Sequence, residues 1–129
     1  MPDRMMLNLA DCVITTGVTD IGLRFIALWS TAHRAALGVV YGVEATDRRN
    51  RCRTFIVHGS FVHPSYRRCG IRSMINDAIF ANLGVELIRS DSGTAEGGAD
   101  FMTRTGYKRD AQGGWYITRE VWQQRRAGR

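Results

Sequence analysis

The stretch VHPSYRRCGIRSM, residues 62–74, joins an apolar run to a segment with helical periodicity. Pro64 ends the run, because proline cannot donate a hydrogen bond to a strand ladder. From Cys69 to Leu83 the apolar residues recur at steps of three and four, which predicts an amphipathic helix that Gly84 ends. The first turn of a helix leaves backbone N–H groups unpaired and carries partial positive charge. Arginines and a glycine at this junction therefore favour an anion-binding cradle or, equally, an ordinary charged loop.

The segments that flank this stretch predict a mixed α/β protein. Upstream, RTFIVHGSFV is rich in β-forming residues, and a glycine inside it, Gly59, is a common mark of a bulge. Downstream, VELIRS has the pattern of a buried strand. Three further elements are expected: a weaker helix over 94–105 closed by Gly106, a strand over 107–110, and a last strand over 115–122 that forms a hairpin with it.

The N-terminal third fits two patterns. Residues 11–16 predict a short strand. Residues 21–36 carry apolar side chains at helical spacing, and residues 21–29 also alternate as in a strand. We favour a strand ending near Ser30, a turn near His33 and Arg34, and a second strand over 37–45, while residues 1–20 as a whole remain a poorly defined segment.

Length and composition bound the class of protein. A chain of 129 residues is enough for one domain, 1–129, and none of its apolar runs is long enough to span a bilayer. The start of the chain has no secretory signal, so we expect a cytoplasmic protein with no membrane association. The net charge of +6 favours an anionic partner: a nucleotide-bearing cofactor, an acidic protein surface or nucleic acid. Nucleic acid is the least expected, because no recognition motif is present. Residues 123–129 are interpreted as a solvated basic tail.

Cysteine and histidine spacings predict no metal site. Cys12, Cys52 and Cys69 are an odd set with no CxxC, so we expect neither a disulfide framework nor a zinc site. We interpret all three as small buried or half-exposed residues rather than nucleophiles. The three histidines, His33, His58 and His63, also lack metal-ligand spacing.

The pattern V-x-P-x-Y-R-x-x-G-I-x-S, residues 62–73, resembles the acyl-CoA-binding motif of the GCN5-related N-acetyltransferase (GNAT) family, whose core is Arg/Gln-x-x-Gly-x-Gly/Ala. The likeness continues on both sides. Residues 37–45 and 53–62 resemble the family's two central antiparallel strands, and VELIRS with GTAEGGADFMTRTGY (93–107) is similar to its next strand and helix. The closing hairpin is similar to its last two strands, so the resemblance covers about residues 36–122.

The resemblance implies a mixed α/β (α+β) fold. Its central sheet is mostly antiparallel, flanked by helices and splayed in the middle, between the strand ending at Val62 and the strand over 85–90. The region before residue 20 is short for the two helices that usually build the family's amine site, so the fold is expected to be shortened at its N-terminus.

The resemblance also implies an activity: transfer of an acetyl group from acetyl-CoA, the co-substrate, to an amine or protein substrate that attacks the thioester directly. A backbone N–H near Phe61 or Val62 would polarise the thioester carbonyl. The pyrophosphate would rest on the N–H groups of residues 67–73. The implied cofactor-binding residues are Phe61, Val62, Arg67, Arg68, Cys69, Gly70, Ile71, Arg72 and Ser73.

Two departures from the family pattern support a second hypothesis. Arg72 stands where the motif ends in a small residue, and either contacts a phosphate or crowds the site. Met102, with Phe101 beside it, stands where the family often places a tyrosine as general acid, and Ser92 or Tyr107 is the available substitute. The alternative is therefore a non-catalytic module of the same fold that regulates a protein partner.

Several single residues are candidates for a general base or for a contact in a homodimer. His58 lies in the strand ending at Val62 and is either a general base or a hydrogen-bonded strand histidine. Glu44 is either an alternative base or a solvated carboxylate. His63 is expected to face solvent and His33 to lie in a turn. The tryptophans, Trp29, Trp115 and Trp122, are core or interface residues by their alternation, and Trp122 late in the last strand is a candidate anchor for a homodimer.

Overall fold

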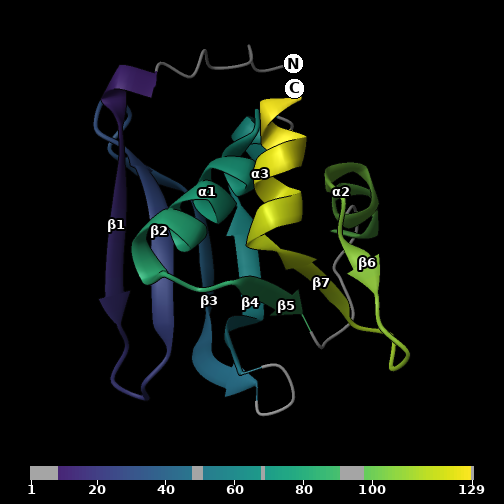
Figure 1. The fold of residues 1–129 in the computed structure, drawn as a ribbon. Helices are drawn as coiled ribbons and strands as arrows, with labels where there is room; N and C mark the ends of the chain where they lie inside the picture. The colour runs from purple at the N-terminus through teal and green to yellow at the C-terminus, as the bar shows by residue number, and fades with distance from the viewer. Residues whose placement is uncertain (1–8, 48–50, 68, 91–97, 129) are drawn as a thin grey trace. The chain divides into compact units, whose positions relative to one another are not determined.

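The computed structural model describes residues 9–47, 51–67, 69–90 and 98–128. They form a mixed α+β fold, as the sequence predicts (Figure 1). In the described residues the strands are β1 (Cys12–Val18), β2 (Arg24–Ser30), β3 (Ala35–Asp47), β4 (Cys52–Val62), β5 (Leu87–Ser90), β6 (Lys108–Arg109) and β7 (Trp115–Thr118). The helices are α1 (Ile71–Leu83), α2 (Gly98–Thr105) and α3 (Arg119–Ala127), with short 3-10 turns η1 (Leu9–Asp11) and η2 (Pro64–Tyr66).

The strands follow the hydrogen-bonded order β1-β2-β3-β4-β5-β7-β6, and the pair β4–β5 is parallel. The chain divides into two compact units. The first contains Met1–Gly42 and Gly59–Leu83, and the second contains Val43–His58 and Gly84–Arg129. The long strands β3 and β4 each contribute residues to both units.

In the first unit, β1, β2 and β3 form an antiparallel meander. This confirms the strand interpretation of residues 21–45 over the helical one. The turn between β2 and β3 lies near His33 and Arg34, as expected, and Arg34 has a positive φ of 50° in it. Residues 19–23 join β1 directly to β2, and a register shift between Leu28 and Trp29 places a bulge in the β2–β3 ladder.

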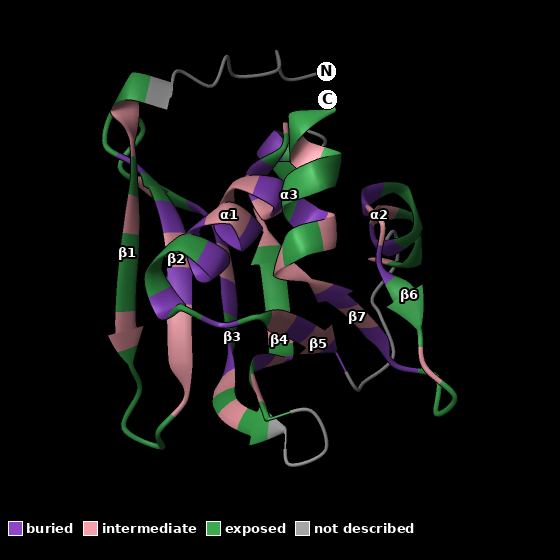
Figure 2. Cartoon of the chain, in the orientation of Figure 1, coloured by how far each residue is buried: buried purple, intermediate pink, exposed green. Residues whose placement is uncertain are grey.

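Helix α1 covers one face of this meander. The strand residues beneath it, Ile26, Leu28 and Val40, are buried (Figure 2). Gly38 is required there, because a Cβ at this position would lie 2.7 Å from Ile71 of α1. Trp29, which follows Leu28 on β2, points to the opposite face by strand alternation and is exposed. The helix therefore buries its apolar stripe on one side of the meander, and its N-terminus emerges beside the end of β4.

Gly59 has a packing reason to be a glycine. The sequence predicts a bulge here, and this stays a prediction. What the structure does show is close approach of a side chain: the ring of Tyr41 on β3 lies over the Gly59 Cα. A Cβ added to Gly59 would lie 2.7 Å from the Tyr41 Cε1 and still closer to its Cζ and Oη atoms.

We expect Gly59→Ala to lower the free energy of unfolding by about 1–3 kcal/mol, the usual cost of forcing extra volume into a packed site. Urea unfolding followed by circular dichroism measures the loss. In a Tyr41→Ala background the same glycine substitution has room, so most of its cost should vanish. An equal cost in both backgrounds would mean that the Tyr41 ring is not the cause.

In the second unit, β5 pairs parallel with β4 and antiparallel with β7, whose other neighbour is β6. The carboxylate of Asp110 closes the β6–β7 turn by accepting hydrogen bonds from the N–H groups of Gln112 (2.9 Å) and Gly114 (2.8 Å). The guanidinium of Arg109 stacks 5.1 Å from the centre of the Trp115 ring. The expected hairpin is therefore confirmed.

The sequence predicts that the last strand runs to Trp122, and this is wrong. Strand β7 ends at Thr118, whose hydroxyl caps α3 by accepting a hydrogen bond from the Val121 N–H at 3.2 Å. Arg119 holds the helix start in place, because its Nε donates to the Val85 carbonyl (3.1 Å) and its backbone N–H to the Glu86 carbonyl (2.9 Å). The residues interpreted as a solvated tail are helical as far as Ala127.

Trp122 is consequently not an exposed strand anchor. It lies on the inner side of α3 with 1% of its surface exposed. The physical reason is the change of period after Thr118, which turns the side chain inward. The homodimer contact predicted at this residue is therefore wrong.

Candidate functional site

The segment between β4 and α1 is held by a small ring cluster of the first unit. Tyr66 of η2 is buried, and its ring lies 5.4 Å from the His63 ring and 6.1 Å from the His33 ring. His63 also caps η2, because its Nδ1 accepts a hydrogen bond from the Ser65 N–H at 3.1 Å. His33 lies in the predicted turn. His63 is half-buried rather than solvent-facing, and it fixes the start of the loop that leads to Gly70.

Gly70 begins the helix. Its φ is +79°, a conformation that favours glycine, and its carbonyl accepts the first α1 hydrogen bond from the Met74 N–H at 3.0 Å. A Cβ at Gly70 would have no neighbouring atom within 4 Å. The backbone N–H groups of the first turn, which the helix ladder does not use, therefore begin beside an open approach. This is the geometry that an anion needs.

The side chains around Gly70 divide into exposed and buried ones. Arg67 is exposed and Cys69 is half-buried, while the side chain of Arg68 lies outside the described residues. Ile71 and Ser73 are buried, so Ser73 offers its backbone N–H rather than its hydroxyl to a ligand. The Arg72 guanidinium follows the helix, and its Nε donates to the Asn76 Oδ1 at 3.1 Å. In this arrangement Arg72 does not extend over Gly70.

The end of β4 shows which of two candidate backbone N–H groups, that of Phe61 or that of Val62, points away from β3. The His63 N–H donates to the Leu37 carbonyl of β3 at 2.8 Å, and the Phe61 carbonyl lies 3.1 Å from where a Gly38 Cβ would stand. Both groups therefore face β3. Because backbone direction alternates along a strand, the N–H of Val62 points away from β3. Val62, rather than Phe61, has an amide directed away from the neighbouring strand, while the Phe61 side chain is half-exposed.

Within the described residues, the parallel ladder between β4 and β5 runs from the pair Thr54–Leu87 to the pair Val57–Ser90, and β4 continues to Val62. The splay expected in the middle of the sheet stays a prediction.

The candidate bases belong to the second unit. His58 on β4 is exposed. The Glu44 carboxylate on β3 faces the Arg53 guanidinium at 3.7 Å, in an ion pair open to solvent. A surface pair of this kind contributes little to stability. His58 thus presents its ring to solvent, whereas Glu44 is engaged by a neighbouring cation.

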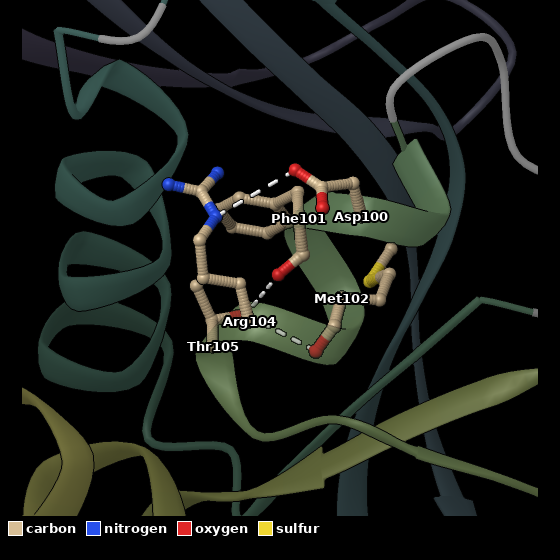
Figure 3. Close-up of polar contacts among 5 residues, drawn as sticks. All are labelled: Asp100, Phe101, Met102, Arg104 and Thr105. Carbon is tan, nitrogen blue, oxygen red and sulfur yellow. Dashed lines mark hydrogen bonds and ion pairs between the residues drawn. The ribbon is translucent and has the colours of Figure 1, made fainter.

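The candidate acid position carries no acid. Met102 of α2 is 5% exposed, and Tyr107 is equally buried, with its N–H bound to the Met102 carbonyl at 2.9 Å. Figure 3 shows Met102 beside the contacts that stabilise α2: the Thr105 hydroxyl donates to the Phe101 carbonyl at 2.7 Å, and Arg104 pairs with Asp100. Ser92, the other substitute considered, lies outside the described residues. The side chains at this position therefore pack into the unit.

Three further features concern possible metal ligands, the Cys12 thiol and membrane-spanning helices. No group of three or more His, Cys, Asp or Glu side chains in the described part of the chain is placed to hold a metal ion. Burial raises the pKa of the Cys12 thiol, and the Asp11 carboxylate adds to the effect, so this thiol is less ionised than usual. Among the described residues, no helix is both long and apolar enough to cross a membrane.

No protein-family model matches the chain, and no curated protein matches it significantly. Solved structures do. A mutant AtaT toxin bound to the C-terminus of the antitoxin AtaR aligns with 88% of this chain and 97% of its own, at 11% identity and a TM-score of 0.64. AtaTR bound with AcCoA aligns over 79% and 71%, at 15% identity and a TM-score of 0.55.

Mutant forms of the spermidine/spermine N-acetyltransferase SpeG from Vibrio cholerae align with 80% of this chain and 70% of theirs, at 16% identity and a TM-score of 0.55. These likenesses confirm the fold expected from the sequence, that of the acyl-CoA N-acyltransferases. The identities are low, so they establish the fold alone.

Proposed function

We propose that the chain is an acetyl-CoA-dependent N-acetyltransferase of the GNAT family. The observation that carries the proposal is the start of α1, where Gly70 leaves open space beside the first-turn N–H groups, next to the end of β4, whose Val62 N–H points away from β3. Acetyl-CoA carries both a pyrophosphate and an extended amide-bearing arm, so it matches both features. The solved structures of this fold include one bound with AcCoA and one of an N-acetyltransferase, which support the same conclusion.

Each feature then has a role. The N–H groups from Gly70 to Ser73 hold the pyrophosphate, and Arg67 adds positive charge at the rim. The Val62 N–H, directed away from β3, donates to the acyl carbonyl and stabilises the negative charge that develops there. Acetyl-CoA supplies the activated acyl group. Arg72 stays on Asn76 and forms one wall of the cradle instead of crowding it.

Proton removal from the amine is assigned to His58. Its ring is exposed, and a neutral imidazole nitrogen can accept a proton from an incoming amine, which suits a general base. Glu44 is the alternative base, but its carboxylate already faces Arg53. The thiolate of CoA leaves without a tyrosine acid, because the residue at that position is Met102.

Acetyl transfer tests the proposal. The full chain is mixed with acetyl-CoA and a panel of acceptors: spermidine, free lysine, and peptides with free N-termini. CoA release and the mass of the acceptor are then measured. We expect release that depends on one acceptor class, and a kcat roughly 100-fold lower in His58→Gln, the low end of the usual loss for a general base. Transfer that is undiminished in His58→Gln would remove the histidine from this role.

A second candidate function is favoured by the buried Met102 and Tyr107: a module of the same fold that binds a protein partner without catalysis. One structure of the same fold is a toxin held by the C-terminus of its antitoxin, so a partner of this kind is compatible with the architecture. Acetyl-CoA binding without transfer to any acceptor would favour this candidate. Transfer to any acceptor contradicts it.

A further inference from the structure

The two edge strands of the sheet differ in a way that points to a partner. Strand β6, at one end of the strand order, has only two residues, and both are cationic. Short length and charge are the usual means by which proteins prevent an edge from pairing with another chain. Strand β1, at the other end, has seven residues, CVITTGV, and none is charged or proline. In the part of the chain that the structure describes, the β6 edge is therefore protected against pairing with another chain and the β1 edge is not.

The hydrogen bonds at both ends of β1 establish which residues face the open edge. The Asp11 carbonyl accepts from the Thr31 N–H at 2.7 Å, and the Thr19 N–H donates to the Leu23 carbonyl at 2.7 Å. The odd-numbered residues between them therefore pair with β2. By alternation, the N–H and C=O groups of Ile14, Thr16 and Val18 point outward. No strand in the described part of the chain pairs with that side.

The side chains along this edge are also suited to burial. Val13 and Val18 are 43% and 60% exposed. Val13 pairs with Trp29 of β2, whose indole is itself exposed, so the apolar surface continues from the edge onto the second strand. Figure 1 shows β1, in purple, at the outer side of the first unit beside β2. Within the described residues, the edge thus combines the outward N–H and C=O groups of Ile14, Thr16 and Val18 with exposed apolar side chains.

We propose that β1 pairs antiparallel with β1 of a second copy of this chain, so that the sheet continues across a two-fold axis. Antiparallel pairing of one strand with itself is self-complementary, since both copies present the same outward groups. Charge favours this meeting point. Each copy carries +6, so two copies repel over most of their surface, but seven uncharged residues face each other along β1. The homodimer contact that Trp122 does not provide is thus located at β1.

The proposal is independent of acetyl-CoA and is tested by mass. Sedimentation equilibrium of the full chain should give twice the 14.5 kDa chain mass at high concentration and a shift toward that mass on dilution. Thr16→Lys places a cation from each copy across the junction, and we expect it to yield monomer throughout. The control Ile21→Lys adds the same charge to an exposed residue beyond the strand, and should dimerise like the original chain.

Hydrogen exchange gives a second measurement that does not depend on charge. In the dimer, the amides of Ile14 and Thr16 should be protected, and the Thr16→Lys variant should lose that protection while keeping it at Thr15, whose amide faces β2. A monomer at all concentrations would overturn the proposal. So would a dimer that survives Thr16→Lys, or one whose Ile14 and Thr16 amides exchange freely.

Discussion

Trp122→Ala is expected to lower the free energy of unfolding by about 3–5 kcal/mol, the usual cost of removing a buried tryptophan from a core. The side chain is 1% exposed on the inner side of α3, and the helix start is tied to Val85 and Glu86 by Arg119. Loss of the indole leaves a cavity that these backbone contacts prevent from closing. Urea unfolding followed by far-ultraviolet circular dichroism, a signal of the backbone rather than of the indole, measures the change.

The control for this prediction is Trp29→Ala, since Trp29 is 38% exposed on β2. It removes the same side chain from a partly solvated position, so its effect on unfolding should be clearly smaller. Comparable costs for the two variants, or a negligible cost at Trp122, would contradict the placement of Trp122 in the core.

The second large effect concerns ligand binding. Gly70→Trp should lower the affinity for acetyl-CoA by at least about 100-fold, because an indole at this position occupies the approach to the first-turn N–H groups. Each hydrogen bond to a charged group contributes about 1.5–3 kcal/mol, so losing two accounts for that factor. Calorimetric titration of the variant measures it.

The chain offers a matched control in Gly22. Its φ is +83° and a Cβ there would also meet nothing within 4 Å, but it lies in the β1–β2 turn. Gly22→Trp therefore introduces the same backbone strain and the same bulk away from the cradle. It should leave affinity unchanged. If both variants lose affinity equally, strain rather than a blocked cradle is responsible.

The sequence predicts most of the central fold, because the signals there are local. Alternation over residues 53–62, the stop at Pro64 and the three- and four-residue steps after Gly70 each determine one element. The N-terminal hairpin was ambiguous, since residues 21–36 satisfy two periods. Pairing with β1 and β3 decides it, and pairing is not visible in a single segment.

The error at the C-terminus has a specific cause. Residues 115–118 alternate as a strand, and the strand pattern extends to Val121 and Trp122 only if Thr118 is treated as a strand residue. Thr118 is instead a helix cap followed by Arg119 and Glu120, a signal outweighed by the β-forming residues around it.

For the site, the motif identified the cradle, but side-chain roles required the structure. The burial of Ser73, the contact of Arg72 with Asn76 and the direction of the Val62 N–H all depend on how the helix packs and where β3 lies. The contact of Tyr41 with Gly59 joins residues far apart in sequence, and no local pattern predicts it.

The central claim is that the start of α1 holds acetyl-CoA, and direct titration of acetyl-CoA into the full chain by calorimetry tests it most directly. We predict saturable binding at one site per chain, accompanied by an upward shift of the melting temperature and abolished in Gly70→Trp but not in Gly22→Trp. The absence of heat and of any thermal shift at millimolar acetyl-CoA would contradict the claim.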